Sequence, residues 1–349
     1  MMEGVIGRWQ HFTGRHVAFH MVLGAALALL PMLLASDTRM QTANLACIYG
    51  IAALGLNVVF GLGGLLSIAQ AAIMAVGGYV FVFLMGTRLG VVPAIVLACL
   101  GGAAVSSLTG LASARVRSHY FILLTLALAE AVILLIQNNP ALTGGSNGLA
   151  MPGNARLFGW DFTTTDGLYF LVMPLLLASW YLADCFKRSR PGLALRALNA
   201  DEYLALMCGI ATGRARFAAT AIGGAFAGLA GALLVIDDAY IGPQSFDIDT
   251  AALLLLMIVL GGPGSNAGTV IAATILTVLL QGTLTMTTIG QLIYGIAIIV
   301  LIIVAPEGLA GLARSLAFRW SRPAAHAASA QPNPGEPPAP RPAAEPSRS

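Results

Sequence analysis

The stretch "RSRPGLALRALNADEYLALMCGI", residues 188–210, is a charged segment in a strongly apolar chain. Of the 349 residues, 58% are hydrophobic and only 9% are charged. A soluble domain is about a quarter charged. The segment nevertheless holds three arginines and two acids, which are Arg188, Arg190, Arg196, Asp201 and Glu202. The apolar stretches on either side of it decide the fold.

Apolar runs of about 20 residues recur along the chain, and each is long enough to cross a hydrocarbon core about 30 Å thick. Because a spanning backbone must satisfy its own hydrogen bonds in lipid, we expect helices. We predict an all-α, polytopic integral membrane helix bundle of about ten transmembrane or re-entrant helices, with a cytoplasmic helix in the charged segment. The expected spans are approximately 17–36, 41–61, 65–86, 90–113, 119–137, 167–184, 214–236, 250–262, 268–283 and 290–305.

The loops between these spans differ sharply in basic charge. With the N-terminus inside, fifteen of the 18 Lys and Arg residues fall on one side of the membrane. The other side receives only Arg39, Arg88 and Arg156. Lys and Arg concentrate in cytoplasmic loops. We therefore expect both termini and residues 188–210 to be cytoplasmic.

Three parts of the chain are expected. Residues 1–16 form a cytoplasmic N-terminal segment, and residues 17–312 form the transmembrane domain with a polar loop at 188–213. Residues 313–349 are rich in Pro and Ala, so we expect a disordered cytoplasmic tail.

The sequence gives no sign of a metal, a cofactor, a disulfide or a nucleic-acid partner. The four cysteines have no CxxC spacing, the five histidines are scattered, and the basic residues are not clustered on a soluble domain. The chain also lacks a GxxxxGK[ST] phosphate-binding loop, so we do not expect it to hydrolyse ATP.

The charged segment has the signals of a broken surface helix. Pro191 favours a helix start, Gly209 favours a helix end, and we expect a break near residues 199–201. The residues expected on its apolar face are Leu193, Ala197 and Leu198, continued by Leu204, Met207 and Cys208. Such a helix either lies on lipid, with its arginines at anionic headgroups, or docks a cytoplasmic partner. The composition is compatible with both.

Polar residues inside the expected spans are candidates for a translocation path. Glu130 is the one acid that we place inside a span, where an ionisable group normally faces a partner or a watery cavity. It is either hydrogen-bonded to neighbours such as the helix face of Thr125 or part of a pore. Asn57, Ser67 and Gln70 either bond the backbone near residues 61–64 or line the path.

Glycine spacing and loop composition add further expectations. Gly224, Gly228 and Gly231 share one helix face, which favours close helix packing over ligand contact. The short eighth and ninth spans flank "GGPGSNAG" (261–268), a pattern typical of broken or re-entrant helices. The outer loop 138–166 is expected to form an ordered cap or a docking surface. Four acids after the seventh span are either solvated or in contact with an external protein: Asp237, Asp238, Asp247 and Asp249.

Several ordered motifs resemble the branched-chain amino acid permease family of ABC importers, and the chain is similar to its M-type subunit. They are "GLNVVFGLGGLLSIAQAAIMAVGGY" (55–79), "HYFILLTLALAE" (119–130), "LTGGSNGL" (142–149), "PGLALRALNADEYLALMCGI" (191–210), "AFAGLAGALL" (225–234), "YIGPQSF" (240–246), "LLLMIVLGGPGSNAGTVIAA" (254–273) and "APEGLAGL" (305–312).

The resemblance implies a permease subunit of an ATP-driven importer in the bacterial inner (plasma) membrane. Its implied partners are cytoplasmic ATP-binding subunits, a second homologous permease, a periplasmic or extracellular solute-binding protein and membrane lipid. The implied coupling residues are Gly192, Arg196, Asp201, Glu202 and Gly209. The chain departs from the family pattern at Leu206, where Glu is frequent, at Leu65, where Gln is frequent, and at Gln70, where His is frequent.

Two other functions remain open at this point. A stand-alone secondary transporter of a small polar solute would need its own ion-coupling group, for which Glu130 is the candidate. A membrane scaffold without transport activity would need residues 191–210 only to lie on lipid. The solute itself is not specified by the sequence.

Overall fold

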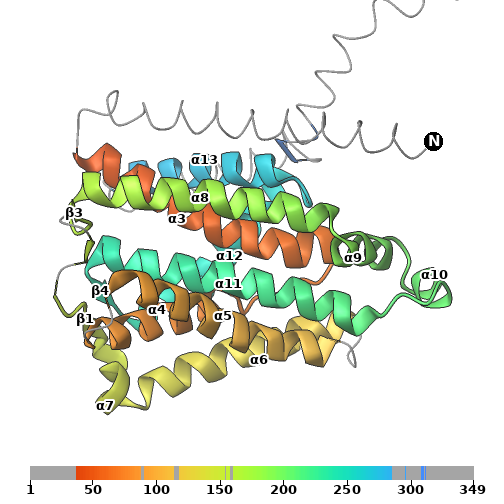
Figure 1. Ribbon diagram of the computed structural model, residues 1–349, viewed down its shortest axis with the longest axis horizontal. Coiled ribbons are helices and arrows are strands. Elements are labelled where there is room, and N and C mark those ends of the chain that lie inside the picture. The colour runs from red at the N-terminus through yellow and green to blue at the C-terminus, as the bar shows by residue number, and fades with distance from the viewer. Residues whose placement is uncertain are drawn as a thin grey trace, which may run out of the picture.

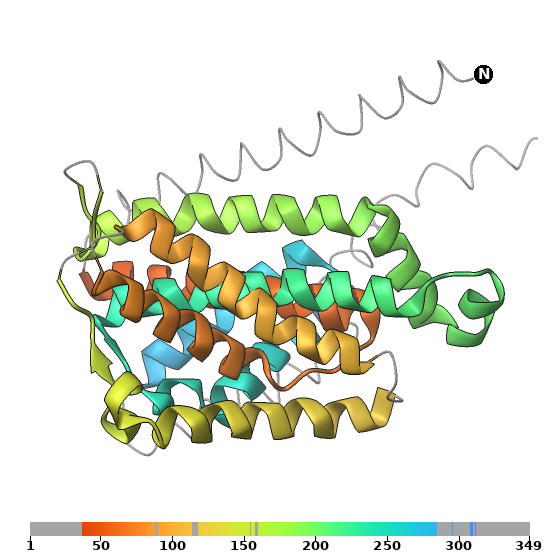
Figure 2. The ribbon, with the colours of Figure 1, turned by 60° about the horizontal axis from the view of Figure 1, so that its bottom comes forward.

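The computed structural model describes residues 37–284 except 88–89, 114–117, 154 and 158–159, together with residues 295, 308, 309 and 311. The described part is a bundle of long helices with two short two-stranded sheets at one end (Figures 1 and 2). The expected N-terminal segment, the first span, nearly all of the tenth span and the expected tail lie outside the described residues.

Eight helical stretches coincide with the other eight expected spans. They are α3 (Asp37–Leu56) with the π-helix η1 (Asn57–Leu62), α4 (Gln70–Met85), α5 (Val91–Ser113), α6 (Ser118–Gln137), α8 (Thr165–Arg188), α11 (Thr212–Asp238), α12 (Ile248–Gly261) and α13 (Asn266–Leu284). Within the described residues, six stretches are long and apolar enough to cross a membrane, whereas α4 and α13 are shorter apolar helices. The chain is therefore a predominantly helical, multi-pass membrane protein.

Small elements close one end of the bundle, which we call the strand end. They are α7 (Pro140–Thr143), η2 (Gly145–Asn147), β1 (Leu149–Ala150), β2 (Arg156–Leu157), β3 (Trp160–Asp161), β4 (Tyr240–Ile241) and η3 (Pro243–Phe246). The strands pair β1 with β4 and β2 with β3, both antiparallel. The Tyr240 hydroxyl donates to the Asn147 carbonyl at 2.7 Å, and Gln244 Nε2 donates to the Ser146 carbonyl at 2.8 Å. The outer loop is thus ordered in large part and attached to the segment after α11.

The opposite end carries α9 (Arg190–Ala200) and α10 (Glu202–Met207), and we call it the α10 end. Figures 1 and 2 both show α10 projecting beyond the last turns of the long helices. The pair η3 and α12 runs from the strand end, where Gln244 meets Ser146, toward the α10 end, where Gly264 accepts a hydrogen bond from Lys187. Because α12 therefore extends along the bundle, the structure does not show it as a re-entrant piece.

Helix α11 packs closely against α4 and α5 through its glycines. A Cβ built on Gly224 would lie 2.5 Å from the Gly102 carbonyl oxygen of α5. Cβ atoms on Gly228 and Gly231 would collide with the carbonyl oxygens of Ala98 in α5 and Met74 in α4. Small residues let helix backbones approach closely in lipid, where apolar side chains gain little by leaving the hydrocarbon. The predicted packing role of these glycines is confirmed.

Because of this packing, adding a single methyl group should lower the stability of the protein. Gly231→Ala places a Cβ against main-chain atoms of Met74 and Gly78, which cannot rotate away. Overpacking of this kind costs about 1–3 kcal/mol, so the purified variant should unfold at a lower temperature in detergent. Gly282→Ala is the control, because nothing lies within 4 Å of its Cβ position. Equal melting temperatures for the two variants would contradict the close approach of α11 to α4.

Candidate functional site

The charged segment folds as two short helices with capped ends. The Ser189 hydroxyl accepts a hydrogen bond from Gly192 N at 3.3 Å at the start of α9. Asp201 Oδ1 accepts from Tyr203 N at 2.9 Å and from Leu204 N at 3.0 Å, which caps α10. Gly209 follows α10 with φ +75°, a conformation that glycine adopts without strain. The expected start, break and end of this helix pair are confirmed.

The expected continuation of the apolar face over Leu204, Met207 and Cys208 is not buried, because all three residues are exposed. The expected face of α9 itself is wrong at Leu193. Its buried residues are Gly192, Leu195 and Leu198, whereas Leu193 is 50% exposed. The buried face follows the spacing of three residues that one side of a helix requires, and Leu193 lies off it. Arg196 is exposed on α9.

Helix α10 presents apolar side chains to its surroundings. Tyr203 is 78% exposed, Leu204 65% and Met207 87%, and Leu206 is also exposed. Within this helix only Ala205 is buried. We call Tyr203, Leu204, Leu206 and Met207 the α10 cap. An exposed apolar cluster on a projecting helix is typical of a protein or membrane contact.

Helix α9 lies on the break between η1 and α4. The Leu195 side chain packs on Gly63, where a Cβ would lie 3.1 Å from Leu195 Cδ1. The Asn199 side chain lies directly against Gly64, leaving no room for a Cβ there. The charged segment therefore touches the chain just before α4 as well as the ends of α8 and α11.

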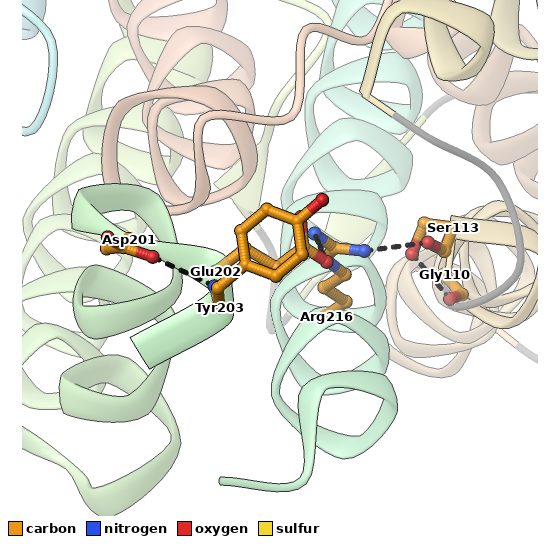
Figure 3. A network of polar contacts seen from close by, with 6 residues as sticks. All are labelled: Gly110, Ser113, Asp201, Glu202, Tyr203 and Arg216. Carbon is orange, nitrogen blue, oxygen red and sulfur yellow. Dashed lines mark hydrogen bonds and ion pairs between the residues drawn. The ribbon is translucent and has the colours of Figure 1, made fainter. Parts of the chain in front are cut away.

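A buried arginine joins α10 to two long helices (Figure 3). Arg216, in the first turns of α11, has a side chain only 8% exposed. Its Nη2 atom lies 2.8 Å from Glu202 Oε1 on α10, and its Nη1 atom donates to the Ser113 carbonyl at 2.8 Å, at the C-terminal end of α5. A cation near a helix C-terminus is stabilised by the helix dipole.

A second polar chain holds the turn between α12 and α13. Asn57 Nδ2 donates to Asn266 Oδ1 at 2.8 Å, and Asn57 Oδ1 accepts from Gly264 N at 2.9 Å. Asn266 Nδ2 in turn donates to Asp184 Oδ1 of α8 at 2.7 Å. Asn57 is fully buried, so these bonds satisfy polar groups that have no access to water.

Gln70 and Thr125 also bond within the bundle. Gln70 Nε2 lies 3.3 Å from the Ala52 carbonyl oxygen and 3.1 Å from that of Gly223. The Thr125 hydroxyl accepts from Ile68 N at 3.2 Å and donates to its own helix. Ser67 is buried as well.

Glu130 lines a small, partly open hollow between α4, α6 and the junction of η3 with α12. The lining is otherwise apolar apart from Asp247 and includes Ile68, Leu126 and Ile133. Glu130 lies two turns before Gln137, so it belongs to the half of α6 nearer the strand end. Neither carboxylate forms an ion pair with a cation of the described residues.

Comparison with known proteins identifies the family. Residues 38–305 match the family described as "Branched-chain amino acid transport system / permease component". The chain belongs to this permease family. The resemblance drawn from the sequence motifs is confirmed.

Three relatives illustrate the breadth of this similarity. The chain is 31% identical over 303 residues to the high-affinity branched-chain amino acid transport system permease protein LivM of Salmonella typhimurium, covering 80% of this chain and 71% of the relative. It is 28% identical over 297 residues to the corresponding LivH protein of Escherichia coli, covering 77% and 92%. It is 27% identical over 244 residues to the ribose import permease protein RbsC of Escherichia coli, covering 66% and 73%. No solved structure is significantly similar to the chain.

In the structure, the residues predicted from the sequence fall into two groups, one at the α10 end and one within the bundle. Gly192, Asp201, Glu202 and Gly209 lie at the α10 end, where they shape the helix pair or pair with Arg216. Of the path candidates, Glu130 lines the hollow. The bonds of Asn57 and Gln70 agree with the backbone-bonding role considered for them, and their place in a path stays a prediction.

Sequence reasoning missed two residues of this permease. Arg216 was counted only as one of the basic residues on the cytoplasmic side, because nothing in the pattern distinguishes a buried arginine from a solvated one. The statement that Glu130 is the one acid inside a span is wrong, since α8 extends to Arg188 and contains Asp184. An acid this close to an apolar span could have been recognised as a hydrogen-bonded group.

The Asn57 network predicts a stability effect. Asn57→Ala leaves Gly264 N and Asn266 without their partners, which costs about 1–3 kcal/mol for each buried group left unsatisfied. The variant should therefore melt at a lower temperature in detergent, whereas Asn138→Ala, an exposed control that bonds only within its helix, should not. A stable Asn57→Ala protein that has lost solute uptake would instead place Asn57 in the path.

Proposed function

We propose that this permease forms part of the translocation path of an ATP-driven importer for branched-chain or related amino acids. ATP is hydrolysed by separate cytoplasmic subunits that bind at the α10 end, and the chain itself has no catalytic role. The projecting apolar α10 cap carries this proposal, because an apolar surface of this kind at the end of a bundle needs a partner. A second homologous permease completes the path, and a periplasmic or extracellular solute-binding protein delivers solute at the strand end.

The distribution of basic residues supports a cytoplasmic α10 end. Among the described residues, six Lys and Arg lie there: Lys187, Arg188, Arg190, Arg196, Arg214 and Arg216. Arg39 and Arg156 lie at the strand end. Lys and Arg accumulate in cytoplasmic loops, so the same end meets both the ATPase and the inner leaflet of the bacterial inner membrane.

The contacts of α9 connect the proposed docking surface to the chain segment before α4. ATP binding closes the ATPase subunits and displaces the helix pair. Leu195 and Asn199 transmit the displacement to residues 63–64, next to α4. Since α4 lines the hollow through Ala71 and Ala72, its movement changes access to that hollow.

The hollow fits an amino acid better than a strongly charged solute. Its walls are mostly apolar, as a branched aliphatic side chain requires, and Glu130 and Asp247 provide acceptors for an ammonium group. The similarity to both branched-chain amino acid permeases and a ribose permease leaves specificity to the solute-binding protein and to this lining.

The α10 cap predicts a docking phenotype. Met207→Glu places a charge in the apolar contact, so retention of a co-expressed ATP-binding subunit of the importer should fall at least about tenfold, the scale of one interface hot spot. Affinity purification of the co-expressed subunits from membranes measures this. Met207→Leu keeps the apolar surface and should retain the ATPase. Equal retention by both variants would exclude the α10 cap as the docking surface.

The hollow predicts a transport phenotype. Glu130→Gln removes a charge-assisted interaction of roughly 1.5–3 kcal/mol, so uptake of leucine by the reconstituted importer should fall by about tenfold or more. Asp249→Asn is the control, since it removes an exposed acid close to, but outside, the hollow lining. Normal uptake by Glu130→Gln would remove Glu130 from the path.

A stand-alone secondary transporter is the second candidate, because Glu130 is unpaired among the described residues that surround the hollow. It requires uptake by this chain alone, driven by an ion gradient. Vesicles that contain only the purified chain test this. Gradient-driven uptake without an ATPase would replace the importer proposal, and no uptake would exclude the secondary transporter.

A further inference from the structure

Arg216 is a buried charge whose partners come from two different parts of the chain. Its guanidinium binds Glu202 of α10 on one side and the last carbonyl of α5, at Ser113, on the other (Figure 3). Removing either partner leaves buried donors without acceptors, which is costly. The three groups therefore stay together when any one of them is displaced.

A short covalent connection from α10 to α11 runs beside this ion pair. Residues 208–211 join the two helices and include Gly209 at φ +75°. The linker is bonded back to α10, because Gly209 N donates to the Leu206 carbonyl and Ile210 N donates to the Ala205 carbonyl. The Glu202–Arg216 ion pair is a second connection between the two helices, with Arg216 Nη2 2.8 Å from Glu202 Oε1.

Helix α11, which carries Arg216, is closely packed against its neighbours. Helix α11 is in backbone contact with α5 at Gly224 and Gly228 and with α4 at Gly231. Closely packed interiors transmit strain, so we expect α4, α5 and α11 to move together. A pull on Arg216 thus reaches α4 and α5 together, and α4 lines the hollow.

We propose that Glu202, Arg216 and the Ser113 carbonyl form the joint through which α10 moves the α4–α5–α11 block, with Arg216 as a positioning residue for transport. This inference rests on the proposed function, because it needs an ATPase that displaces α10. It adds the element that converts docking into movement of the spanning helices.

The test uses the complete importer in proteoliposomes, with its ATPase, its second permease and its solute-binding protein. Solute imported per ATP hydrolysed is measured for Glu202→Gln, Arg216→Gln and the double variant. Breaking the joint should lower this ratio by roughly tenfold, within the range usual for coupling free energies. The double variant should be no worse than the single ones, because all three break the same link. Arg214→Gln, an exposed arginine on the same helix, should leave the ratio unchanged.

A purely structural role would lower the amount of assembled complex but not the ratio of solute to ATP. If Arg216→Gln does not fold, Glu202→Gln decides, because Glu202 is 46% exposed and Gln has nearly its shape. An unchanged ratio in Glu202→Gln, or multiplied losses in the double variant, overturns the joint while leaving the proposed function intact. A wild-type chain that retains no ATPase overturns both.

Discussion

The backbone of α11 lies directly against the backbones of α5 and α4 at Gly228 and Gly231, and at Gly224 it lies against Ser106 and the Gly102 carbonyl of α5. In lipid, helices gain little from burying apolar surface against one another, so close van der Waals contact and polar bonds must hold them together. This contact creates one stiff unit from three helices. Arg216 belongs to this unit through α11, and the hollow borders it through α4.

Polar groups are placed where this unit meets the rest of the chain. Asn57 and Asn266 connect η1, the turn before α13 and α8, while Arg216 connects α10, α11 and α5. Breaking these bonds would leave the buried Asn57, Asn266 and Arg216 side chains with unsatisfied polar groups away from water. The apolar α10 cap is the opposite case, a surface with no partner inside the described chain. The protein thus combines a closely packed interior with one projecting apolar surface. This combination suits a subunit that is moved by a bound partner.

Sequence periodicity predicted the described helices well, because spans must be long and apolar and their ends are marked by charge or glycine. The caps at Asp201 and Gly209 were also predictable, since they are local signals. The burial of Arg216 was not, because it depends on Glu202 and on Ser113, which is 103 residues away. Leu193 was misplaced for a related reason, since the buried face of α9 is set by what lies beneath it. Glu130 was identified by its cost in lipid, but only the structure shows the hollow beside it.

The most direct test is to determine which side of the membrane the α10 end faces, because docking of an ATPase requires it to be cytoplasmic. Arg196 lies exposed on α9, so a single cysteine there, in a chain whose four native cysteines are replaced by alanine, reports which compartment the helix pair faces. A membrane-impermeant maleimide should leave intact cells unlabelled at this position and label inside-out membrane vesicles fully. Labelling of intact cells would place α9 and α10 on the exterior, out of reach of any ATPase, and would contradict the account.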